Sequence, residues 1–457
     1  MRVMRDRPAK VAPLSVRLVR ASVWVALLGA MASCGAPPSP SVESRAGPCA
    51  GQPPGCGSPL GTAQALAAGR WSALPNAPLT ARSDQSALWT GAELLIWGGA
   101  TSSGTGSQSH QISQADGAGF EPATGAWHRL PPAPLAPRQG AAAAWTGTEA
   151  IVWGGDNAGA QGGVSETFAD GASYDPSTGQ WRGLPGAPLS PRTGATAIWT
   201  GREVIFLGGR SANGRTLLDG ATYDPADRSW ARLPPFPALR RGSPVGTTVV
   251  WTGKQLLVWA TNQVFSYPAP NTVGISGAQH GATWEPGWSS WRPMAPPPAG
   301  VATFGATALW TGTTVLLLNG TNCLPAMSCP ALDLPSERTF DPSTGSWGKA
   351  PSNLVAGAAG PIVWTGNAVV ALNGGAEAGG PAGTTLSPGD GVVYDPRAGV
   401  WRNLPRSPLG ALYGASIFWT GRQILLWGAV AGAGPSLGEA LTPGAPEQGR
   451  SALRVRG

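Results

Sequence analysis

Short apolar segments recur along the chain in pairs, and a brief polar turn separates the two members of each pair. Residues 141–145 and 149–153 form one such pair, and residues 195–199 and 203–207 form another. Segments of this length bounded by Thr-Gly are typical of antiparallel strands joined in a tight hairpin. The pattern therefore predicts a succession of short β-hairpins.

The tripeptide Trp-Thr-Gly marks the turn of each pair and occurs seven times, at intervals of 52 to 59 residues. Its copies begin at Trp89, Trp145, Trp199, Trp251, Trp310, Trp364 and Trp419. Self-similarity at a period of about 50 residues is typical of propellers and solenoids. Most of the chain is therefore one array of repeats.

A second phrase alternates with the first and consists of an aromatic residue, an acidic residue and Pro, with a Trp seven residues after the aromatic. Its six copies begin at Phe120, Tyr174, Tyr223, Trp284, Phe340 and Tyr394, and their Trp residues are Trp127, Trp181, Trp230, Trp291, Trp347 and Trp401. The Pro ends a third strand, and the following turn leads into a fourth strand that begins at the Trp. Together the two phrases predict four short antiparallel strands in each repeat.

In combination these motifs resemble the Kelch-repeat β-propeller. Gly-Gly pairs end the second strands at residues 98–99, 154–155, 208–209 and 374–375, and Arg-x-Gly opens the first strands at residues 138–140 and 192–194. The resemblance covers residues 71–443. Trp-Thr-Gly departs from the Asn/Asp-Gly turn that is more usual in that family.

The two ends of the array indicate how the ring closes. Residues 71–75 match a fourth strand with no partners before them, and residues 437–443 match a degenerate third strand with no Trp after it. We therefore predict an all-β, seven-bladed Kelch-type propeller with four antiparallel strands per blade, in which the N-terminal strand completes the C-terminal blade. Such closure removes the open sheet edges that invite aggregation.

The N-terminus has the layout of a secretory signal. Residues 1–33 combine six basic residues with an apolar run at residues 21–28, and residues 31–35 resemble a bacterial lipobox ending at Cys34. We expect Cys34 to be lipidated, which places the protein in the cell envelope, at the outer membrane or periplasm of a Gram-negative cell. Plain secretion, with Cys34 free or disulfide-bonded, is the alternative.

The remaining segments complete the domain plan. Residues 34–70 are rich in Pro, Gly and Ala and predict a flexible tether, and residues 444–457 predict a polar tail. The signal carries six of the 31 basic and one of the 24 acidic residues, so the mature chain has 25 basic and 23 acidic residues. No basic run remains, so a nucleic acid partner is not expected, and the lipid anchor is the expected membrane contact.

Four further cysteines predict disulfides in an oxidising compartment. They are Cys49 and Cys56 in the tether and Cys323 and Cys329 in one repeat. Three connectivities are possible, and the two local pairs are favoured because short loops close easily. None forms a Cys-x-x-Cys pair and no His is near, so we expect neither a metal nor another cofactor.

The connections from second to third strands and from blade to blade share one face of the predicted ring, and binding sites favour such variable loops. Candidate ligand-binding residues expected at this face are Arg82, Arg138, Arg192, Asp116, Asp170, Asp219, His280 and Asp390. The arginines could clamp a ligand carboxylate or sulfate. Alternatively, Arg and Asp pair with each other within each repeat.

Nearly all of the 21 Trp occupy repeated positions, which indicates core packing rather than carbohydrate stacking, and Trp288 is an exception. The three His fall in separate repeats and no Ser/His/Asp spacing is present. The leading interpretation is a monomeric, non-catalytic binding or scaffolding module for a protein or glycan. The alternative, which the Kelch resemblance also allows, is an exported enzyme acting on a sugar, similar to the sialic-acid mutarotases. A close pair of two carboxyl groups, or of a carboxyl and a guanidinium group, inside the channel with shifted pKa values would favour the enzyme.

Overall fold

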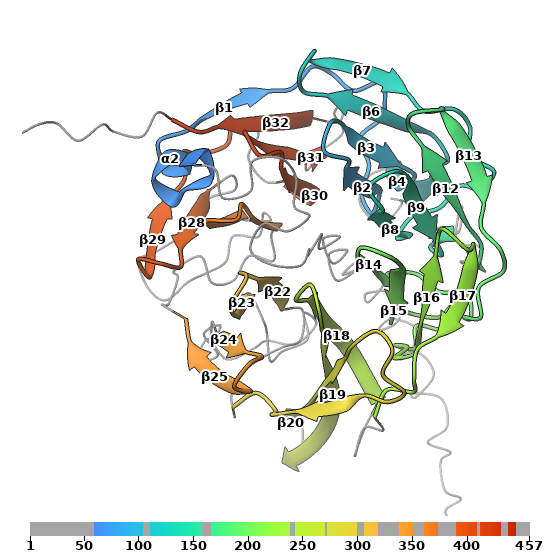
Figure 1. Cartoon of the computed structure of the whole chain (residues 1–457), viewed down its shortest axis with the longest axis vertical. Coiled ribbons are helices and arrows are strands. Elements are labelled where there is room, and N and C mark those ends of the chain that lie inside the picture. The colour runs from blue at the N-terminus through green and yellow to red at the C-terminus, as the bar shows by residue number, and fades with distance from the viewer. Residues whose placement is uncertain are drawn as a thin grey trace, which may run out of the picture.

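The computed structural model describes residues 59–103, 110–157, 166–237, 243–269, 272–298, 306–318, 338–350, 361–372, 390–408, 412–430 and 437–444. Within these residues the chain forms seven four-stranded antiparallel sheets arranged as the blades of a ring (Figure 1). The predicted all-β, seven-bladed propeller is confirmed.

The first three blades carry most of the features discussed below. Blade 1 contains β2 (Ser86–Trp89), β3 (Leu94–Trp97), β6 (Gly117–Glu121) and β7 (Ala126–Arg129). Blade 2 contains β8 (Ala142–Trp145), β9 (Ala150–Trp153), β12 (Gly171–Asp175) and β13 (Gln180–Gly183). Blade 3 contains β14 (Thr196–Trp199), β15 (Val204–Leu207), β16 (Gly220–Asp224) and β17 (Ser229–Arg232). Two-stranded ribbons extend the second-to-third connections of blades 1 and 2, namely β4 (Ala100–Ser103) with β5 (His110–Ser113) and β10 (Asp156–Asn157) with β11 (Glu166–Thr167).

The remaining blades follow the same order. Blade 4 contains β18 (Ser243–Trp251), β19 (Leu256–Ala269), β20 (Thr272–Trp284) and β21 (Arg292–Met294). Blade 5 contains β22 (Thr307–Trp310), β23 (Val315–Leu318), β24 (Arg338–Asp341) and β25 (Ser346–Lys349). Blade 6 contains β26 (Ile362–Trp364), β27 (Val369–Leu372), β28 (Gly391–Asp395) and β29 (Val400–Asn403). Blade 7 contains β30 (Leu412–Trp419), β31 (Ile424–Val430), β32 (Leu437–Thr442) and the N-terminal β1 (Arg70–Ala73).

The Trp-Thr-Gly turn works through its Thr hydroxyl and its Gly backbone. Thr90 Oγ1 accepts a hydrogen bond from the Glu93 amide at 3.0 Å and donates to the Glu93 carbonyl at 3.2 Å. Gly91 has a φ of 99°, a left-handed conformation that disfavours residues with a Cβ. The Thr side chain thus supplies the turn contacts that an Asn or Asp provides in other hairpins.

The Trp of the fourth strand connects a blade to the preceding blade through its indole nitrogen, a bond that the described residues show in six of the blades. The indole Nε1 of Trp127 donates to Pro75 O at 2.9 Å, and Trp181 and Trp230 repeat the bond to Pro131 and Pro185 at 3.0 Å. Trp71 makes the same bond to Pro405 O of blade 6 at 2.8 Å. Trp71 is therefore a true fourth-strand Trp, although it comes first in the chain.

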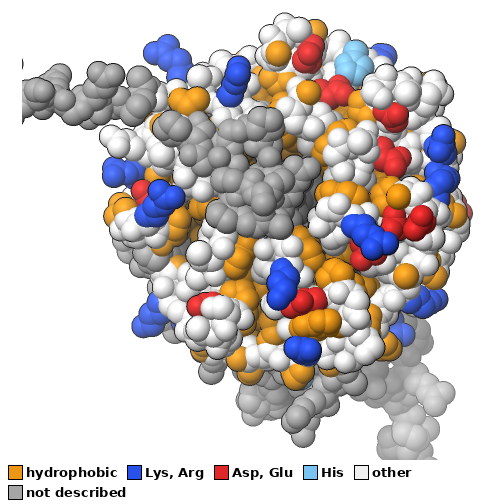
Figure 2. Space-filling model, in the orientation of Figure 1, with side chains coloured by type: hydrophobic (Ala, Val, Ile, Leu, Met, Phe, Trp, Pro, Cys, Tyr) orange, Lys and Arg blue, Asp and Glu red, His pale blue; other side chains and the backbone are white. Residues whose placement is uncertain are grey.

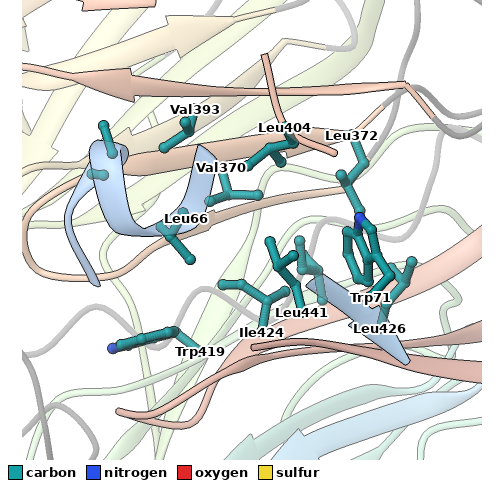
Figure 3. Packing of buried hydrophobic residues seen from close by; sticks show 13 residues of the cluster. Leu66, Trp71, Val370, Leu372, Val393, Leu404, Trp419, Ile424, Leu426 and Leu441 are labelled. Atoms are coloured by element: carbon teal, nitrogen blue, oxygen red, sulfur yellow. The ribbon is translucent and has the colours of Figure 1, made fainter. Parts of the chain in front are cut away.

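Closure of the ring is as predicted. Strand β1 pairs antiparallel with β32, with Trp71 opposite Leu441. The Trp71 side chain is 8% exposed and belongs to a cluster that combines blade 7 residues such as Ile424 and Leu426 with blade 6 residues such as Val370 (Figure 3). Burial between two blades stabilises this short strand in the ring.

The N-terminal boundary differs from the sequence prediction. Residues 59–69, which we expected in the flexible tether, include a 3₁₀ turn (Pro59–Gly61) and helix α2 (Ala63–Ala67). Ala63, Ala65 and Leu66 are at most 1% exposed. Ala63 and Leu66 pack in one cluster with residues of blades 6 and 7, so residues 59–69 are part of the folded domain.

Trp288 also departs from expectation. It lies outside the repeated positions, but it packs against the core between blades 3 and 4 and Arg292 stacks on its ring at 3.8 Å. Cys34, Cys49, Cys56, Cys323 and Cys329, the signal segment and residues 445–457 lie outside the described residues. Among the residues that are described, helices long and apolar enough to cross a bilayer are absent.

Candidate functional site

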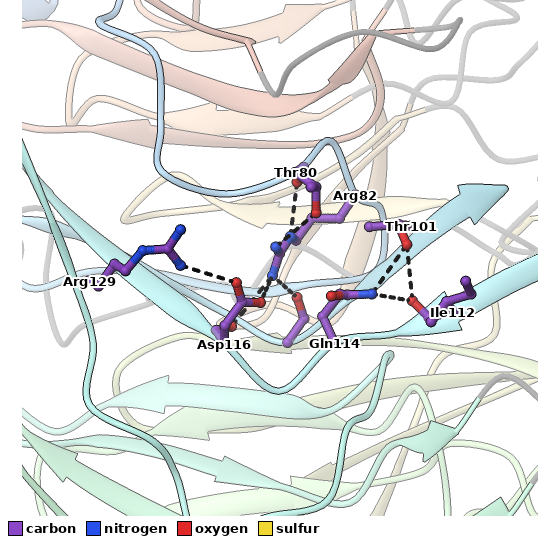
Figure 4. Close-up of polar contacts among 8 residues, drawn as sticks. Thr80, Arg82, Thr101, Ile112, Gln114, Asp116 and Arg129 are labelled. Carbon is purple, nitrogen blue, oxygen red and sulfur yellow. Dashed lines mark hydrogen bonds and ion pairs between the residues drawn. The ribbon is translucent and has the colours of Figure 1, made fainter.

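The three predicted arginines lie inside their blades, each paired with the predicted aspartate. Arg138 is fully buried, and its Nη1 donates to Asp170 Oδ1 at 2.8 Å and to the Gly154 carbonyl at 3.0 Å. Arg82 pairs with Asp116 at 2.7 Å and Arg192 pairs with Asp219 at 2.8 Å in the same way. Figure 4 shows the arrangement in blade 1, where Arg129 also reaches Asp116.

These contacts assign the arginines to the framework. Each guanidinium holds the first Gly carbonyl of a Gly-Gly corner and one aspartate, so its donors are occupied in the interior. Asp116, Asp170 and Asp219 are about half exposed, at 43%, 58% and 46% of their side-chain surface. In the structure, each arginine is paired with the aspartate of its own repeat. The arginines could clamp a ligand only if these bonds broke.

The other two candidates are arranged differently. Asp390 Oδ1 lies 3.8 Å from Arg406 Nε, just before β28 of blade 6. His280 stands opposite Ala260 in blade 4, and its buried Nε2 has no hydrogen-bond partner among the described residues. The structure therefore does not bring His280 and Asp390 together with the three Arg–Asp pairs.

Three short segments meet where the channel-lining strands β2, β8 and β14 begin. The Gly140 amide donates to the Asp84 carbonyl at 2.8 Å, and the Gly194 amide donates to the Gly140 carbonyl at 2.8 Å. These residues are equivalent, since each stands two positions after the framework arginine of its blade. The hydrogen bonds link blades 1, 2 and 3 around one mouth of the central channel, opposite to the Trp-Thr-Gly turns.

Two carboxyl groups lie at this mouth on adjacent blades. Asp156 follows the Gly-Gly pair of blade 2, and its Oδ1 accepts a hydrogen bond from Gln139 Nε2 at 3.0 Å. Burial raises the pKa of Asp156, and the hydroxyl of Thr193 and the amide of Gln139 oppose that shift. Burial also raises the pKa of Asp84, opposed by the Ser83 hydroxyl and increased by the negative charge of Asp156. Both carboxyls therefore retain protons more readily than exposed aspartates do.

The groups around the two carboxyls are polar. Gln139 Oε1 is a buried acceptor without a partner in the described part of the chain. Thr193 pairs through its backbone with Arg210, which stands in blade 3 where Asp156 stands in blade 2. We call Asp84, Gln139, Asp156, Thr193 and Arg210 the mouth cluster. It brings carboxyl, amide and hydroxyl side chains from three blades, together with the backbone of Arg210, to one opening.

Sequence reasoning missed Asp84 and Asp156, although both left a signal. In blades 2 and 3 the residue two positions after the framework arginine is Gly, and in blade 1 that residue is Asp84. Asp156 directly follows a Gly-Gly pair. Both aspartates are irregularities within a repeat, while the residues singled out as candidates were the regular ones. Regular positions serve the framework, and irregular positions are where a single site can be built.

Known proteins match this chain through structure alone. No protein family model and no curated protein matches it. Among solved structures, a fungal alcohol oxidase in complex with copper shares 14% identity over 82% of this chain and 76% of its own, with a TM-score of 0.54. The structure of YjhT shares 14% identity over 82% of this chain and 98% of its own, with a TM-score of 0.42. The likeness to the oxidase structure supports the propeller fold. The Kelch family remains a resemblance of motifs.

The copper of the oxidase structure raises the question of a metal here. Within the residues that are described, no group of three or more His, Cys, Asp or Glu side chains could hold a metal ion. His128 lies 3.5 Å from Glu93 on blade 1, away from the mouth cluster.

Proposed function

We propose that this protein is an exported, lipid-anchored binding module that holds a hydroxyl-rich ligand of the glycan class at the mouth cluster. The observation that supports it is that Asp84 and Asp156 lie on adjacent blades at one mouth of the channel, linked through neighbouring residues: the Gly140 amide bonds to the Asp84 carbonyl and the Gln139 side chain bonds to Asp156. Export and anchoring rest on the signal-like residues 1–33 and on Cys34. The protein binds as a monomer.

The chemistry of the cluster suits sugar hydroxyls. A carboxyl that keeps its proton can donate as well as accept a hydrogen bond, and the Gln139 amide has the same double capacity. Sugar hydroxyls need both kinds of partner. The ribbons β4–β5 and β10–β11 stand beside the mouth on blades 1 and 2, where variable segments on a rigid scaffold can select among ligands.

The part of the surface that Figure 2 draws is mixed in charge. Figure 2 shows acidic and basic side chains interspersed over one face of the ring, without a large area of a single sign among the coloured residues. Electrostatic steering of a highly charged polymer needs such an area. A neutral or weakly charged glycan does not.

A second candidate, an enzyme acting on a sugar, is favoured by the raised pKa of both aspartates. When two neighbouring carboxyls both resist ionisation, one can hold a proton while the other is ionised. Such a pair can deliver a proton to one atom of a sugar and remove a proton from another. The same residues would then bind and convert the ligand.

A glycan and peptide array probed with the Cys34→Ser protein tests the binding proposal. We expect glycan signals that fall at least tenfold in Asp156→Asn and remain in Asp227→Asn, whose exposed carboxylate lies on the opposite face. Equal signals in wild type and Asp156→Asn would contradict the assigned site, and signals confined to peptides would contradict the ligand class. NMR of each bound sugar separates the two candidates, because conversion that stops in Asp84→Asn while binding persists indicates an enzyme.

A further inference from the structure

The segment before the closing strand packs across the joint between blades 6 and 7. We call residues 59–69, which contain the 3₁₀ turn and helix α2, the N-terminal clasp. Helix α2 contacts β28 and β29 of blade 6, and Leu66 lies in the same cluster as Ile424 and Leu441 of blade 7 (Figure 3). The clasp thus touches both blades at the joint that strand β1 closes.

One end of the clasp is fixed to a turn of blade 6. Thr365, in the Trp-Thr-Gly turn that follows β26, donates its hydroxyl proton to the Gly61 carbonyl at 2.6 Å. Thr365 is fully buried, whereas Thr200 at the equivalent position of blade 3 is partly exposed. A Cβ at Gly61 would lie 3.1 Å from Thr365 and 3.2 Å from the Trp419 ring, so the contact is close on both blades.

The other end of the clasp is fixed to the end of blade 7. The Gly444 amide, just after β32, donates to the Ala65 carbonyl at 2.9 Å. A Cβ at Gly69 would lie 2.7 Å from the Thr442 carbonyl, which allows only glycine there without rearrangement. The chain therefore enters and leaves the ring through one tightly packed patch.

Strand β1 needs such support because it is short. Its residues show the burial pattern exposed, buried, exposed, exposed, so Trp71 is its one buried anchor. The clasp immediately precedes β1 in the chain, and peeling of β1 from its N-terminal end must first detach α2. Tension on the residues before Pro59 would reach the Gly61–Thr365 contact before it reaches β1.

We propose that the N-terminal clasp is a locking device that joins blade 6 to blade 7 and keeps strand β1 in the ring. When a force pulls on an N-terminal attachment, the N-terminal clasp bears that force before strand β1 does. The proposal is independent of the ligand and of the mouth cluster, which lies on the opposite face.

Hydrogen exchange of the full chain under native conditions tests the clasp. Leu66→Ala removes the buried anchor of α2, and Thr365→Val removes the hydroxyl bonded to Gly61. Thr200→Val is the matched control, because Thr200 makes the same turn bonds to Arg202 and Glu203 but does not touch the clasp. We expect amides of β1 to exchange at least fivefold faster in both clasp variants and at the wild-type rate in Thr200→Val.

The internal reference is the pair β15–β16 in blade 3, whose exchange should not change in the clasp variants. Acceleration of β1 by less than fivefold in both clasp variants would overturn the proposal. Equal acceleration in Thr200→Val would do so too, since it would show that loss of any such turn loosens the ring. If Leu66→Ala does not fold, the comparison of Thr365→Val with Thr200→Val decides alone.

Discussion

Asp84 has a left-handed backbone conformation, with a φ of 54°, at a position where Gly140 and Gly194 stand in the next two blades. Residues with a Cβ seldom adopt this conformation, although Asp and Asn tolerate it better than most. Strained non-glycine residues concentrate at functional sites, where side-chain chemistry justifies the strain. The strain at Asp84 agrees with a functional role for its carboxyl.

Replacing Asp84 by Gly should therefore stabilise the fold while weakening ligand capture. Relief of the left-handed strain is expected to raise the free energy of unfolding by about 1 kcal/mol. Urea denaturation measures this effect, and the arrays described above measure binding. Gly140→Ala, which adds a Cβ in the same conformation beside Thr193, is the control and should destabilise the protein. A less stable Asp84→Gly protein would argue against strain at this position.

The raised pKa of Asp156 predicts a specific dependence of stability on pH. A carboxyl whose pKa is higher in the folded than in the unfolded chain makes the folded state bind more protons, so stability falls as pH rises. The loss begins near the ordinary value of 3.8 and ends above the raised pKa. Wild type should therefore lose stability relative to Asp156→Asn across this window, as measured by denaturation midpoints from pH 3.5 to 7. A constant difference would show that burial does not shift this group.

At the scale of elements, contacts between neighbouring blades repeat around the ring with informative exceptions. At three joints an alanine of the third strand shares a cluster with an alanine of the preceding connection, such as Ala172 and Ala133 between blades 1 and 2. At the joint between blades 6 and 7 the equivalent residues are Glu439 and Ser407, both buried, and the Ser407 hydroxyl donates to Glu439 Oε2 at 2.5 Å. A polar pair thus replaces an apolar contact at the joint that β1 closes.

The effects of replacing Ser407 and Glu439 on the free energy of unfolding should be strongly coupled. Ser407→Ala alone removes a donor from a buried carboxyl and should cost about 1–3 kcal/mol of unfolding free energy. In the double variant Glu439→Ala/Ser407→Ala both groups become alanines, as at the joint between blades 1 and 2, and the loss should be smaller than the sum of the single losses. Thermal or urea unfolding of the four proteins gives the coupling energy. Additive losses would mean that the two side chains act independently.

Trp71 comes before the seven repeats in the chain, but it anchors the closing strand β1 and should contribute strongly to the free energy of unfolding. Trp71→Ala removes a buried indole and its hydrogen bond to Pro405, at an expected cost of about 3–5 kcal/mol. Trp288→Ala removes a half-buried ring that contacts the core at one side, so we expect a cost of about 1 kcal/mol. Thermal denaturation compares the two. Equal effects would contradict the dominant contribution of β1 to closure.

At the scale of the whole molecule, the ring presents two different faces. The chain enters at the N-terminal clasp and the described part ends at Gly444, both on the face of the Trp-Thr-Gly turns. The mouth cluster lies on the other face. A tether that leaves from residue 59 would therefore leave the mouth directed away from its point of attachment.

The anchor itself can be tested in the full-length protein. We expect the mature protein to enter the detergent phase in a phase-separation experiment and Cys34→Ser to move it to the aqueous phase, because an acyl chain supplies most of the membrane affinity. Cys323→Ser, outside the lipobox-like segment, is the control and should partition like the wild type. An unchanged partition of Cys34→Ser would reject the lipid anchor.

The sequence alone determined the architecture because each blade is encoded by local patterns. Short apolar strand segments, Thr-Gly turns and the spacing of the Trp residues all act within about 50 residues, so they can be read without knowing what packs against them. The closing role of residues 71–75 followed from the same register. A signal of this kind repeats seven times, and each copy supports the interpretation of the others.

Only the tertiary structure decided which irregular residues meet. Asp84 and Asp156 belong to different blades, and their proximity depends on how neighbouring blades pack rather than on any local pattern. The same holds for helix α2, whose five residues carry too weak a local signal to stand out in a Pro- and Gly-rich segment. Its helix forms because the joint between blades 6 and 7 offers a surface that buries Leu66, and that surface exists only after the ring has closed.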